Sequence, residues 1–413
     1  MSEGANGSKV ARIGLLGRGT VGSAFAELIA QRGGAVEATA GRRPEISGVL
    51  RRSEGDFEEI LAGSDLIVEL IGGIEPARSY MLAAIAAGKP VVTANKQLIA
   101  QHGDELFAAA REAGVQLRFE AAVAGAIPII RVVQESLGAL EIERISGIVN
   151  GTTNFILSEM AATGADYEEV LARAQELGYA EADPTEDVNG ADAAAKMAIL
   201  ARLAFDTPVS LGDVSFEGIE EIRPDDIAYA SELGLSLKLL GVAERHGDAI
   251  SARVFPCFLY GGHPLAPVEG PFNAITVEAP SITEITMSGP GAGGIETASA
   301  VLGDVVSILA GDAPVHQPGE PLNIRRDLDS SFYLHLEVAD RPGVLASIAE
   351  VLGRNGLSVK SVVQRGLGDE ARLVMILHRA AEASFYAAVD EIAGLEFMRA
   401  APRAIRVVEK EYV

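Results

Sequence analysis

Residues 10–22 read Val-Ala-Arg-Ile-Gly-Leu-Leu-Gly-Arg-Gly-Thr-Val-Gly, and this stretch decides the fold of the first part of the chain. Its first seven residues form a short, largely apolar run that is typical of a buried strand, and a G-x-G-x-x-G pattern follows from Gly17 to Gly22. Apolar residues then recur at helical spacing from Val21 to Ile29. A strand, a glycine loop and a helix in this order predict a site where backbone N–H groups approach a pyrophosphate at the start of a helix.

Further apolar runs alternate with helical patterns beyond this site. Gly33-Gly34 is expected to stop the first helix, so that residues 35–40 form the next strand. Short apolar runs follow at residues 66–71, 91–94 and 115–119, with helical stretches between them. The alternation predicts an α/β fold with a Rossmann-type doubly wound parallel sheet over residues 1–130.

Two features near residue 40 bear on the cofactor. An acidic residue about 20 positions beyond the glycine loop can accept a hydrogen bond from the ribose of NAD, and Glu37 lies at that distance. Glu37 is nevertheless predicted inside a strand, and the turn beyond it carries Arg42 and Arg43, which can pair with a 2′-phosphate. We therefore expect NADP, with NAD as the alternative.

The segment 181–196 holds a second group of informative residues. Asp192 and Lys196 are four residues apart in an alanine-rich helical pattern and project from one face, while Glu181 and Asp187 lie in the loop that precedes them. Such a cluster can hold an ammonium group with its carboxylates while the lysine exchanges a proton with a carbonyl oxygen. The spacing alone leaves a surface ion pair open.

Two shorter motifs lie where ligands are expected. Lys96 ends the sequence Thr-Ala-Asn-Lys at the carboxyl end of a predicted strand, the edge at which open α/β sheets bind ligands. It can reach a nicotinamide or a substrate, and a solvated lysine is the alternative. Residues 150–154, Asn-Gly-Thr-Thr-Asn, can bind a carboxylate or cap the next helix, and their spacing favours capping.

The rest of the chain divides into two predicted parts. Residues 131–325 mix helical patterns and β-like runs in a substrate-binding and dimerisation domain whose topology the pattern does not reveal, and residues 295–320 are expected to pack back on the first domain. A loop rich in Gly and Pro separates this part from the tail. Residues 330–413 follow the order βαββαβ, which predicts a ferredoxin-like domain.

Composition excludes several classes of partner and location. Lys and Arg number 34 against 58 Asp and Glu, a net charge of −24, so neither nucleic acid nor an anionic membrane is an expected partner. Residues 1–8 are small and polar, and no stretch approaches the roughly 18 apolar residues that a membrane-spanning helix needs. Cys257 is the single cysteine, which excludes an intrachain disulfide and suits a cytoplasmic location.

Together these motifs resemble homoserine dehydrogenase, in the monofunctional form that ends in an ACT domain. The matching segments are residues 17–22, 93–96, 150–154, 181–196 and 289–304, in the family's order along nearly the whole chain. The resemblance implies an NAD(P)-dependent interconversion of L-homoserine and L-aspartate 4-semialdehyde on the route to threonine, methionine and isoleucine. It also implies a homodimer or homotetramer whose ACT domains bind an amino-acid effector, naturally threonine, where residues 340–343 and Asn355 of one copy meet the other copy. A dimerisation domain without an effector is the alternative.

The resemblance also assigns roles by position. It implies that Lys196 is the general acid/base, supported by Asp192 and Lys96. The implied substrate-binding residues are Glu181, Asp187, Asp192, Asn150, Gly151 and Thr152. With the two arginines near residue 40, the cofactor-binding set is Gly17, Arg18, Gly19, Thr20, Val21, Gly22, Arg42, Arg43, Thr93, Lys96, Gly178, Glu181 and Gly293. A structural sodium-like cation is implied at Glu120 and the carbonyl groups of Val123, Gly125 and Ile127.

Two other functions remain as alternatives. An aspartate-semialdehyde dehydrogenase combines a similar first domain with a semialdehyde, but it needs a cysteine nucleophile, and Cys257 lies within an apolar run. A non-enzymatic amino-acid sensor would explain the ACT-like tail and would leave the glycine loop and Lys196 unexplained.

Overall fold

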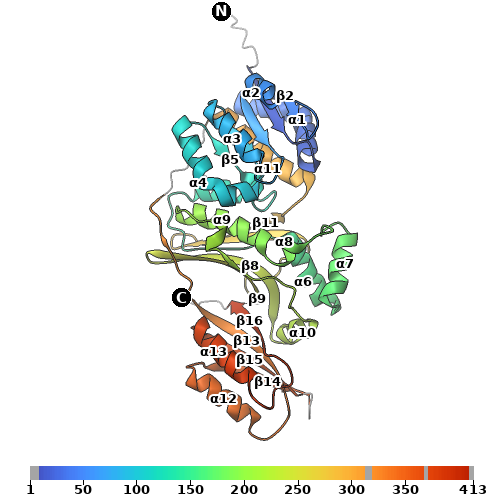
Figure 1. The fold of residues 1–413 in the computed structure, drawn as a ribbon, viewed down its shortest axis with the longest axis vertical. Helices are drawn as coiled ribbons and strands as arrows, with labels where there is room; N and C mark the ends of the chain where they lie inside the picture. The colour runs from blue at the N-terminus through green and yellow to red at the C-terminus, as the bar shows by residue number, and fades with distance from the viewer. Residues whose placement is uncertain (1–8, 312–318, 367–370, 409–413) are drawn as a thin grey trace, which may run out of the picture.

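The computed structural model describes residues 9–311, 319–366 and 371–408, which form three parts arranged along the long axis of the molecule (Figure 1). The N-terminal α/β domain lies at one end, the middle domain follows, and the C-terminal domain lies at the other end. Among the helices of these residues, none combines the length and the apolar character that crossing a membrane requires.

The first domain is built on a five-stranded parallel sheet in the order β2-β1-β3-β4-β5. Its strands are β1 (Lys9–Leu16), β2 (Arg42–Leu50), β3 (Leu66–Glu69), β4 (Val91–Thr93) and β5 (Leu117–Arg118). Helices α1 (Thr20–Ala40) and α11 (Gly294–Ala310) pack on one face, and α2 (Phe57–Gly63), α3 (Ala77–Ala86) and α4 (Lys96–Ala113) pack on the other. The predicted doubly wound parallel sheet is confirmed.

Helix α1 is longer than the sequence suggested. It continues through Gly33-Gly34 to Ala40 and ends at Gly41, which has a left-handed φ of 70°. Gly33 is buried in the same stripe as Ile29 and Val36, so packing against the sheet outweighs the cost of about 1 kcal/mol that a glycine imposes inside a helix. The predictions of a helix end at Gly33 and of a strand over residues 35–40 are therefore wrong.

The middle domain has a sheet whose neighbouring strands are antiparallel, in the order β11-β10-β6-β8-β9. These strands are β6 (Arg144–Ile148), β8 (Leu235–His246), β9 (Ala249–Tyr260), β10 (Phe272–Ala279) and β11 (Thr283–Pro290). Helices α6 (Gly151–Thr163), α9 (Ala191–Phe205) and α10 (Pro224–Glu232) pack against this sheet, and α7 (Tyr167–Glu176) and α8 (Thr185–Val188) lie beside them. The sheet supports the helices that carry the acidic residues and the lysine of segment 181–196.

The C-terminal domain confirms the predicted βαββαβ order. It comprises β13 (Asp329–Val338), α12 (Val344–Arg354), β14 (Val359–Arg365), β15 (Ala371–Ala381), α13 (Glu382–Ala393) and β16 (Arg403–Val408), with sheet order β16-β13-β15-β14. Phe332 and Phe385 stack at 3.6 Å between ring centroids in its core. The turn between β14 and β15 lies largely outside the described residues.

The middle and C-terminal sheets are continuous. Strand β16 pairs in parallel with β9, with Arg406 opposite Cys257, so the two sheets belong to a single eleven-stranded sheet. Tyr333 and Val407 of the C-terminal domain belong to the same buried cluster as residues of the middle domain. The tail is therefore joined to the middle domain through backbone hydrogen bonds as well as packed side chains, although most of the predicted loop before it, residues 312–318, lies outside the described residues.

Candidate active site

The glycine loop is tightly packed on one side and open on the other. A Cβ on Gly17, whose φ is +97°, would overlap the carbonyl oxygen of Leu70, and a Cβ on Gly22 would overlap that of Gly17. A Cβ on Gly19 would meet no atom of the described residues within 4 Å. The loop therefore leaves space at Gly19, at the start of α1, where the N–H groups of a helix can approach a pyrophosphate.

Helix α11 brings a second glycine turn to this loop. Gly293 precedes α11, and a Cβ on Gly294 would lie 3.0 Å from the methyl group of Thr20. Four cofactor candidates, Arg18, Gly19, Thr20 and Gly293, are therefore near one another, and the first three are exposed. Helix α11, although distant in sequence, packs against α1 through apolar side chains of one buried cluster, which include Phe25 and Val301.

Arg42 and Arg43 lie at the opposite end of the sheet from the glycine loop. They begin β2, where Arg42 pairs in register with Lys9, whereas Leu50 at the other end pairs with Leu16. The expectation that they form a turn beside the cofactor is wrong because α1 extends to Ala40, and Glu37 is at the same remote end on α1. Arg42 instead contacts Asp65.

Arg51 and Arg52, rather than Arg42 and Arg43, follow the strand end that lies beside the glycine loop. They follow Leu50 directly, the carbonyl of Leu50 accepts from the N–H of Gly17 at 2.9 Å, and both arginines are exposed. A doubly wound sheet reads the ribose substituent at this end of its second strand. The sequence would have revealed these residues if β2 had been placed at 42–50.

A buried carboxylate orders the loops that follow β3 and β4. Glu69 is fully buried, and its oxygens accept from the N–H groups of Ile71 and Gly72 and from the Thr93 hydroxyl, the last at 2.6 Å. The Thr93 side chain is fully buried in this network and is directed away from solvent. Asn95 caps α4 by accepting from the N–H of Leu98, which sets the position of Lys96 in the first turn. Glu69 carries no motif in the sequence that marks it as part of the site.

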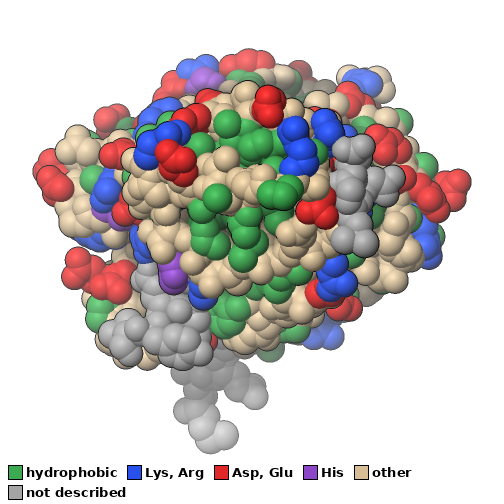
Figure 2. Space-filling view, turned by 90° about the horizontal axis from the view of Figure 1, so that it is seen from below, with side chains coloured by type: hydrophobic (Ala, Val, Ile, Leu, Met, Phe, Trp, Pro, Cys, Tyr) green, Lys and Arg blue, Asp and Glu red, His purple; other side chains and the backbone are tan. Residues whose placement is uncertain are grey.

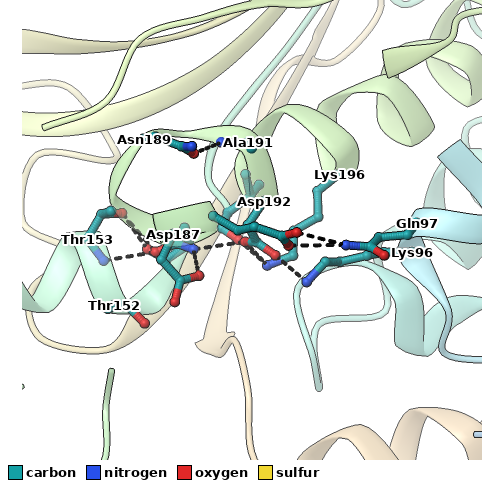
Figure 3. Close-up of polar contacts among 12 residues, drawn as sticks. Lys96, Gln97, Thr152, Thr153, Asp187, Asn189, Ala191, Asp192 and Lys196 are labelled. Carbon is teal, nitrogen blue, oxygen red and sulfur yellow. Dashed lines mark hydrogen bonds and ion pairs between the residues drawn. The ribbon is translucent and has the colours of Figure 1, made fainter. Parts of the chain in front are cut away.

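Two lysines from different domains meet on Asp192 (Figure 3). Lys196, one turn later on α9, places Nζ 2.7 Å from Oδ2, and Lys96, from the start of α4, places Nζ 2.5 Å from Oδ1. Lys196 also donates to the carbonyl of Val149 at 2.8 Å. Asp192 and Lys196 thus share one helix face as predicted, and their side chains are only 4% and 13% exposed, so this is not a surface ion pair.

Burial and charge act in opposite directions in this cluster. Burial alone would raise the pKa of Asp192, but the charges of Lys196 and Lys96 outweigh burial and hold that pKa well below its usual value. Burial would lower the pKa of Lys96, but the charges of Asp192, Asp187 and Glu186 keep it above the usual value. Burial raises the pKa of Asp187, against a hydrogen bond from Asn150. The centre therefore holds both Asp192 and Lys96 in their charged forms.

Asn150 links this centre to helix α6. Its Oδ1 accepts from the N–H of Thr153 at 2.8 Å, which confirms the predicted cap, and its Nδ2 donates to Asp187 at 2.7 Å and to Asp192 at 2.8 Å. Asn150 therefore caps a helix and also bridges the two carboxylates. Gly151 and Thr152 form the first turn of α6.

The loop after α7 reaches the same helix end. Thr152 donates to the carbonyl of Tyr179 at 2.7 Å, which places Gly178 nearby. Glu181 lies exposed in the loop before α8, and its backbone carbonyl accepts from Gln175. Lys96, Asn150, Asp187, Asp192 and Lys196 are thus linked by direct contacts, while the Glu181 side chain lies outside that network of contacts.

The proposed cation residues lie in a loop after β5. Glu120 is buried, and its carboxylate oxygens accept from the N–H groups of Ile130 and Arg131 at 2.8 and 2.9 Å. Burial and the charge of Asp304 raise the pKa of Glu120 to about 7. The carboxylate is thus engaged with the N–H groups of α5 (Ile129–Arg131), and the carbonyl of Ile127 accepts from the N–H of Ile129.

Cys257 is the nucleophile that the alternative aspartate-semialdehyde dehydrogenase would need. Cys257 is fully buried in β9, and burial raises the pKa of its thiol to about 12, so it is not available as a nucleophile.

In the C-terminal domain, a cavity of about 410 Å³ is lined by residues that include Asp340, Arg341 and Gly343. Asn355 does not line this cavity of the single chain, and its amide donates to the carbonyl of Val351 in α12. The expected effector site, where residues 340–343 and Asn355 of one copy meet another copy, stays a prediction.

Comparison with known families identifies all three parts of the chain. Residues 17–120 match the family described as homoserine dehydrogenase, NAD binding domain, and residues 128–306 match homoserine dehydrogenase. Residues 333–397 match the ACT domain.

Relatives of known name match over nearly the full length. The homoserine dehydrogenase of Corynebacterium glutamicum is 44% identical, over 96% of this chain and 95% of the relative. The crystal structure of a homoserine dehydrogenase from Thiobacillus denitrificans superposes with a TM-score of 0.93 at 37% identity, covering 98% of this chain and 99% of the other. A hyperthermophilic archaeal homoserine dehydrogenase in complex with NADPH superposes with a TM-score of 0.64 at 27% identity, covering 76% and 100%.

Proposed function

This chain belongs to the homoserine dehydrogenase family, and from that premise we propose that the centre around Asp192 binds the substrate and that Lys196 exchanges the proton of its reacting oxygen. The protein is an oxidoreductase that acts on a CH–OH group with a nicotinamide nucleotide, interconverting L-homoserine and L-aspartate 4-semialdehyde. The observation that carries the residue assignment is the meeting of Lys96 and Lys196 on one buried carboxylate between the first two domains.

The glycine loop suits the nucleotide. Its open side at Gly19 leaves room for the pyrophosphate between the exposed Arg18 and Thr20. Gly17 and Gly22 allow the tight turn beneath that space, and Val21 and Gly293 complete the proposed cofactor set. When bound, the nicotinamide supplies the hydride acceptor for oxidation or the hydride donor for reduction. The protein has to hold the substrate carbon against the nicotinamide and transfer one proton to or from the substrate oxygen.

Lys196 manages that proton. In the reductive direction its Nζ donates a proton to the carbonyl oxygen of the semialdehyde, and in the oxidative direction it accepts the hydroxyl proton of homoserine. Val149 and Asp192 each accept one of its N–H groups, which leaves the third for the substrate oxygen. Lys96, on α4 of the first domain, pairs with the same Asp192 carboxylate as Lys196 does.

Asp187 and Glu181 are the better candidates for the substrate ammonium group. Both oxygens of Asp192 are already used, Oδ1 by Lys96 and Oδ2 by Lys196 and Asn150. Asp187 accepts from the same Asn150 amide as Asp192, and within the described residues it makes no ion pair. Asp192 is therefore assigned to holding the lysines, with Asn150, Gly151 and Thr152 positioning the substrate.

The decisive assay follows NADPH oxidation with L-aspartate 4-semialdehyde and NADP reduction with L-homoserine. Turnover in both directions is expected. Absence of both would reject the proposed substrate, and binding of amino acids without any turnover would favour the sensor alternative.

We expect Arg51 and Arg52 to select NADP by pairing with its 2′-phosphate. Changing both to alanine should weaken NADP(H) binding by about 1.5–3 kcal/mol per charged hydrogen bond lost, while NAD(H) binding changes little. The archaeal relative that was solved with NADPH is consistent with this choice. Kd values for both nucleotides, measured by fluorescence titration, give the answer, and the Arg42→Ala/Arg43→Ala variant at the remote end of β2 is the control. Equal losses for NAD(H) and NADP(H) would contradict the assignment.

We expect threonine to bind the cavity of the ACT domain and to inhibit. Gly343 lies in its lining with a φ of +96°, which side chains adopt only with strain, so Gly343→Asp should distort the turn and fill the cavity. Allosteric coupling of about 1–3 kcal/mol makes inhibition clearly measurable. Threonine titrations should show inhibition of the wild type and relief in Gly343→Asp, with Gly353→Asp on the same helix as control. If threonine, methionine, isoleucine and lysine all fail to inhibit, the domain serves assembly.

The family resemblance leads us to expect a monovalent cation at Glu120 and the carbonyl oxygens of Val123, Gly125 and Ile127. Hard oxygen ligands suit sodium, whose role there would be structural. Replacing sodium by choline at equal ionic strength should then lower the melting temperature. An unchanged melting temperature would contradict a structural cation at this site.

The ACT domain also suggests how the enzyme assembles. Seen from that end, Figure 2 shows hydrophobic side chains exposed among charged ones. Among the described residues of this domain, the large exposed apolar side chains are Leu345, Val359, Val362 and Tyr386. A homodimer or homotetramer in the cytoplasm is the expected form, and light scattering should give at least twice the chain mass of 43.1 kDa.

A further inference from the structure

Arg406 of β16 joins the ACT domain to a loop of the middle domain. Its Nη1 donates to both carboxylate oxygens of Glu217, at 2.8 and 2.9 Å, and its Nε and Nη2 donate to Glu382 at the start of α13, at 3.0 and 2.8 Å. The guanidinium also lies 5.0 Å from the ring centroid of Phe255, and its side chain is 10% exposed. Arg406 is therefore a rigid link between Glu382 of the ACT domain and Glu217 of the middle domain.

The backbone after Glu217 lies directly against the turn between α8 and α9. The N–H of Ile219 donates to the carbonyl of Val188 at 2.9 Å, and a Cβ on Gly218 would overlap that carbonyl oxygen. Gly190 has a φ of +89°, and a Cβ on it would lie 2.8 Å from the carbonyl oxygen of Glu217. Gly190 and Gly218 thus allow the backbone of residues 217–219 to pack directly against the backbone of residues 188–190. Because this packing is close, a displacement of Glu217 would also displace the 188–190 turn.

That turn connects the acidic residues of the substrate site. Asp187 lies on α8 just before the turn at residues 188–190, and Asp192 lies in the first turn of α9 just after that turn. We infer that Arg406 and Glu217 are positioning residues, which hold the 188–190 turn and thereby set Asp187 and Asp192 for substrate binding. The inference rests on the proposed substrate site and gives the ACT domain a direct structural connection to it.

A neighbouring arginine provides a matched control. Arg253 of β9 donates to the same Glu382 at 2.7 Å and lies 4.7 Å from the same Phe255 ring, with a side chain 12% exposed. Its ion pair is with Glu382, whereas Arg406 pairs with Glu382 and Glu217. Arg253→Lys therefore perturbs the domain junction without removing the link to Glu217.

The test measures steady-state kinetics of homoserine oxidation by the full-length enzyme. Arg406→Lys keeps the charge but cannot hold both carboxylates in the same planar geometry, and Glu217→Gln changes a side chain that is 53% exposed and should fold normally. Each should raise the KM for homoserine by about 3- to 30-fold, the size of effect seen for residues that couple distant sites, while the KM for NADP stays within about twofold. The double variant should have a homoserine KM no higher than that of the more affected single variant, because both substitutions break the same Arg406–Glu217 contact.

Two results would overturn this inference. An unchanged homoserine KM in Glu217→Gln would remove Glu217 from the link, and an equal rise in Arg253→Lys would attribute the effect to domain docking in general. Failure of the proposed function has a different signature, which is the absence of homoserine oxidation by the wild type.

Discussion

Replacing Lys196 by alanine should lower kcat by at least about 100-fold, the lower end of what a positioned general acid/base contributes. Val149 and Asp192 hold Nζ at 2.8 and 2.7 Å in a buried site, and alanine leaves no group there that can exchange a proton with the substrate oxygen. The Kd for NADPH should change little, because the glycine loop lies in the first domain. Stopped-flow measurement of hydride transfer and a fluorescence titration of NADPH give the two numbers.

Lys238→Ala is the control for the loss of a buried lysine. Lys238 lies on β8 and donates to the carbonyl of Val268, away from Asp192. Its variant should keep kcat within a few-fold of the wild type. Near-normal turnover in Lys196→Ala would refute the assignment, and a larger loss in Lys96→Ala would transfer the proton-exchange role to Lys96.

The local signals in the sequence predicted the parts of the site that lie close together along the chain. The glycine loop follows a strand and opens a helix, and Asp192 and Lys196 share a helix face because they are one turn apart. Asn150 was recognisable as a cap because its side chain acts three residues ahead. Each of these inferences depends only on helix geometry or turn chemistry.

The misplaced cofactor arginines show where such reasoning fails. A glycine pair normally weakens a helix, but Gly33 sits in the buried stripe of α1, and the sheet and α11 pack against that helix. Tertiary packing thus overrode the local preference and moved the next strand to Arg42–Leu50. The shift placed Arg51 and Arg52, rather than Arg42 and Arg43, at the end of the sheet that carries the glycine loop.

Contacts between distant segments were not predictable from spacing. Lys96 reaches Asp192 only because α4 of the first domain lies beside α9 of the second. The pairing of β16 with β9 likewise depends on an exposed strand edge in each domain, which no local pattern encodes. The tail was therefore expected as a separate unit, although its last strand completes a sheet that extends to the middle domain.

Replacing Asp192 by asparagine should abolish most activity and also shift its dependence on pH. The carboxylate is the shared partner of Lys96 at Oδ1 and Lys196 at Oδ2, and an amide has one acceptor oxygen and no charge. Lys196 loses its orientation, so kcat should fall by about 100-fold or more. The pKa of Lys96 is now held above its usual value against the effect of burial, largely by Asp192, so without that charge it should fall.

The direction of the pH shift follows from the charge of Lys96. A lower pKa means that Lys96 loses its proton at lower pH, so the alkaline limb of the kcat/KM profile should move to lower pH in Asp192→Asn. Asp187→Asn is the matched control, because Asp187 shares Asn150 with Asp192 but is hydrogen-bonded to neither lysine. That variant should raise the KM for homoserine and affect kcat less. If both variants changed only KM, Asp192 would bind substrate as Asp187 does, and the assignment of Asp192 as the group that holds the two lysines would be wrong.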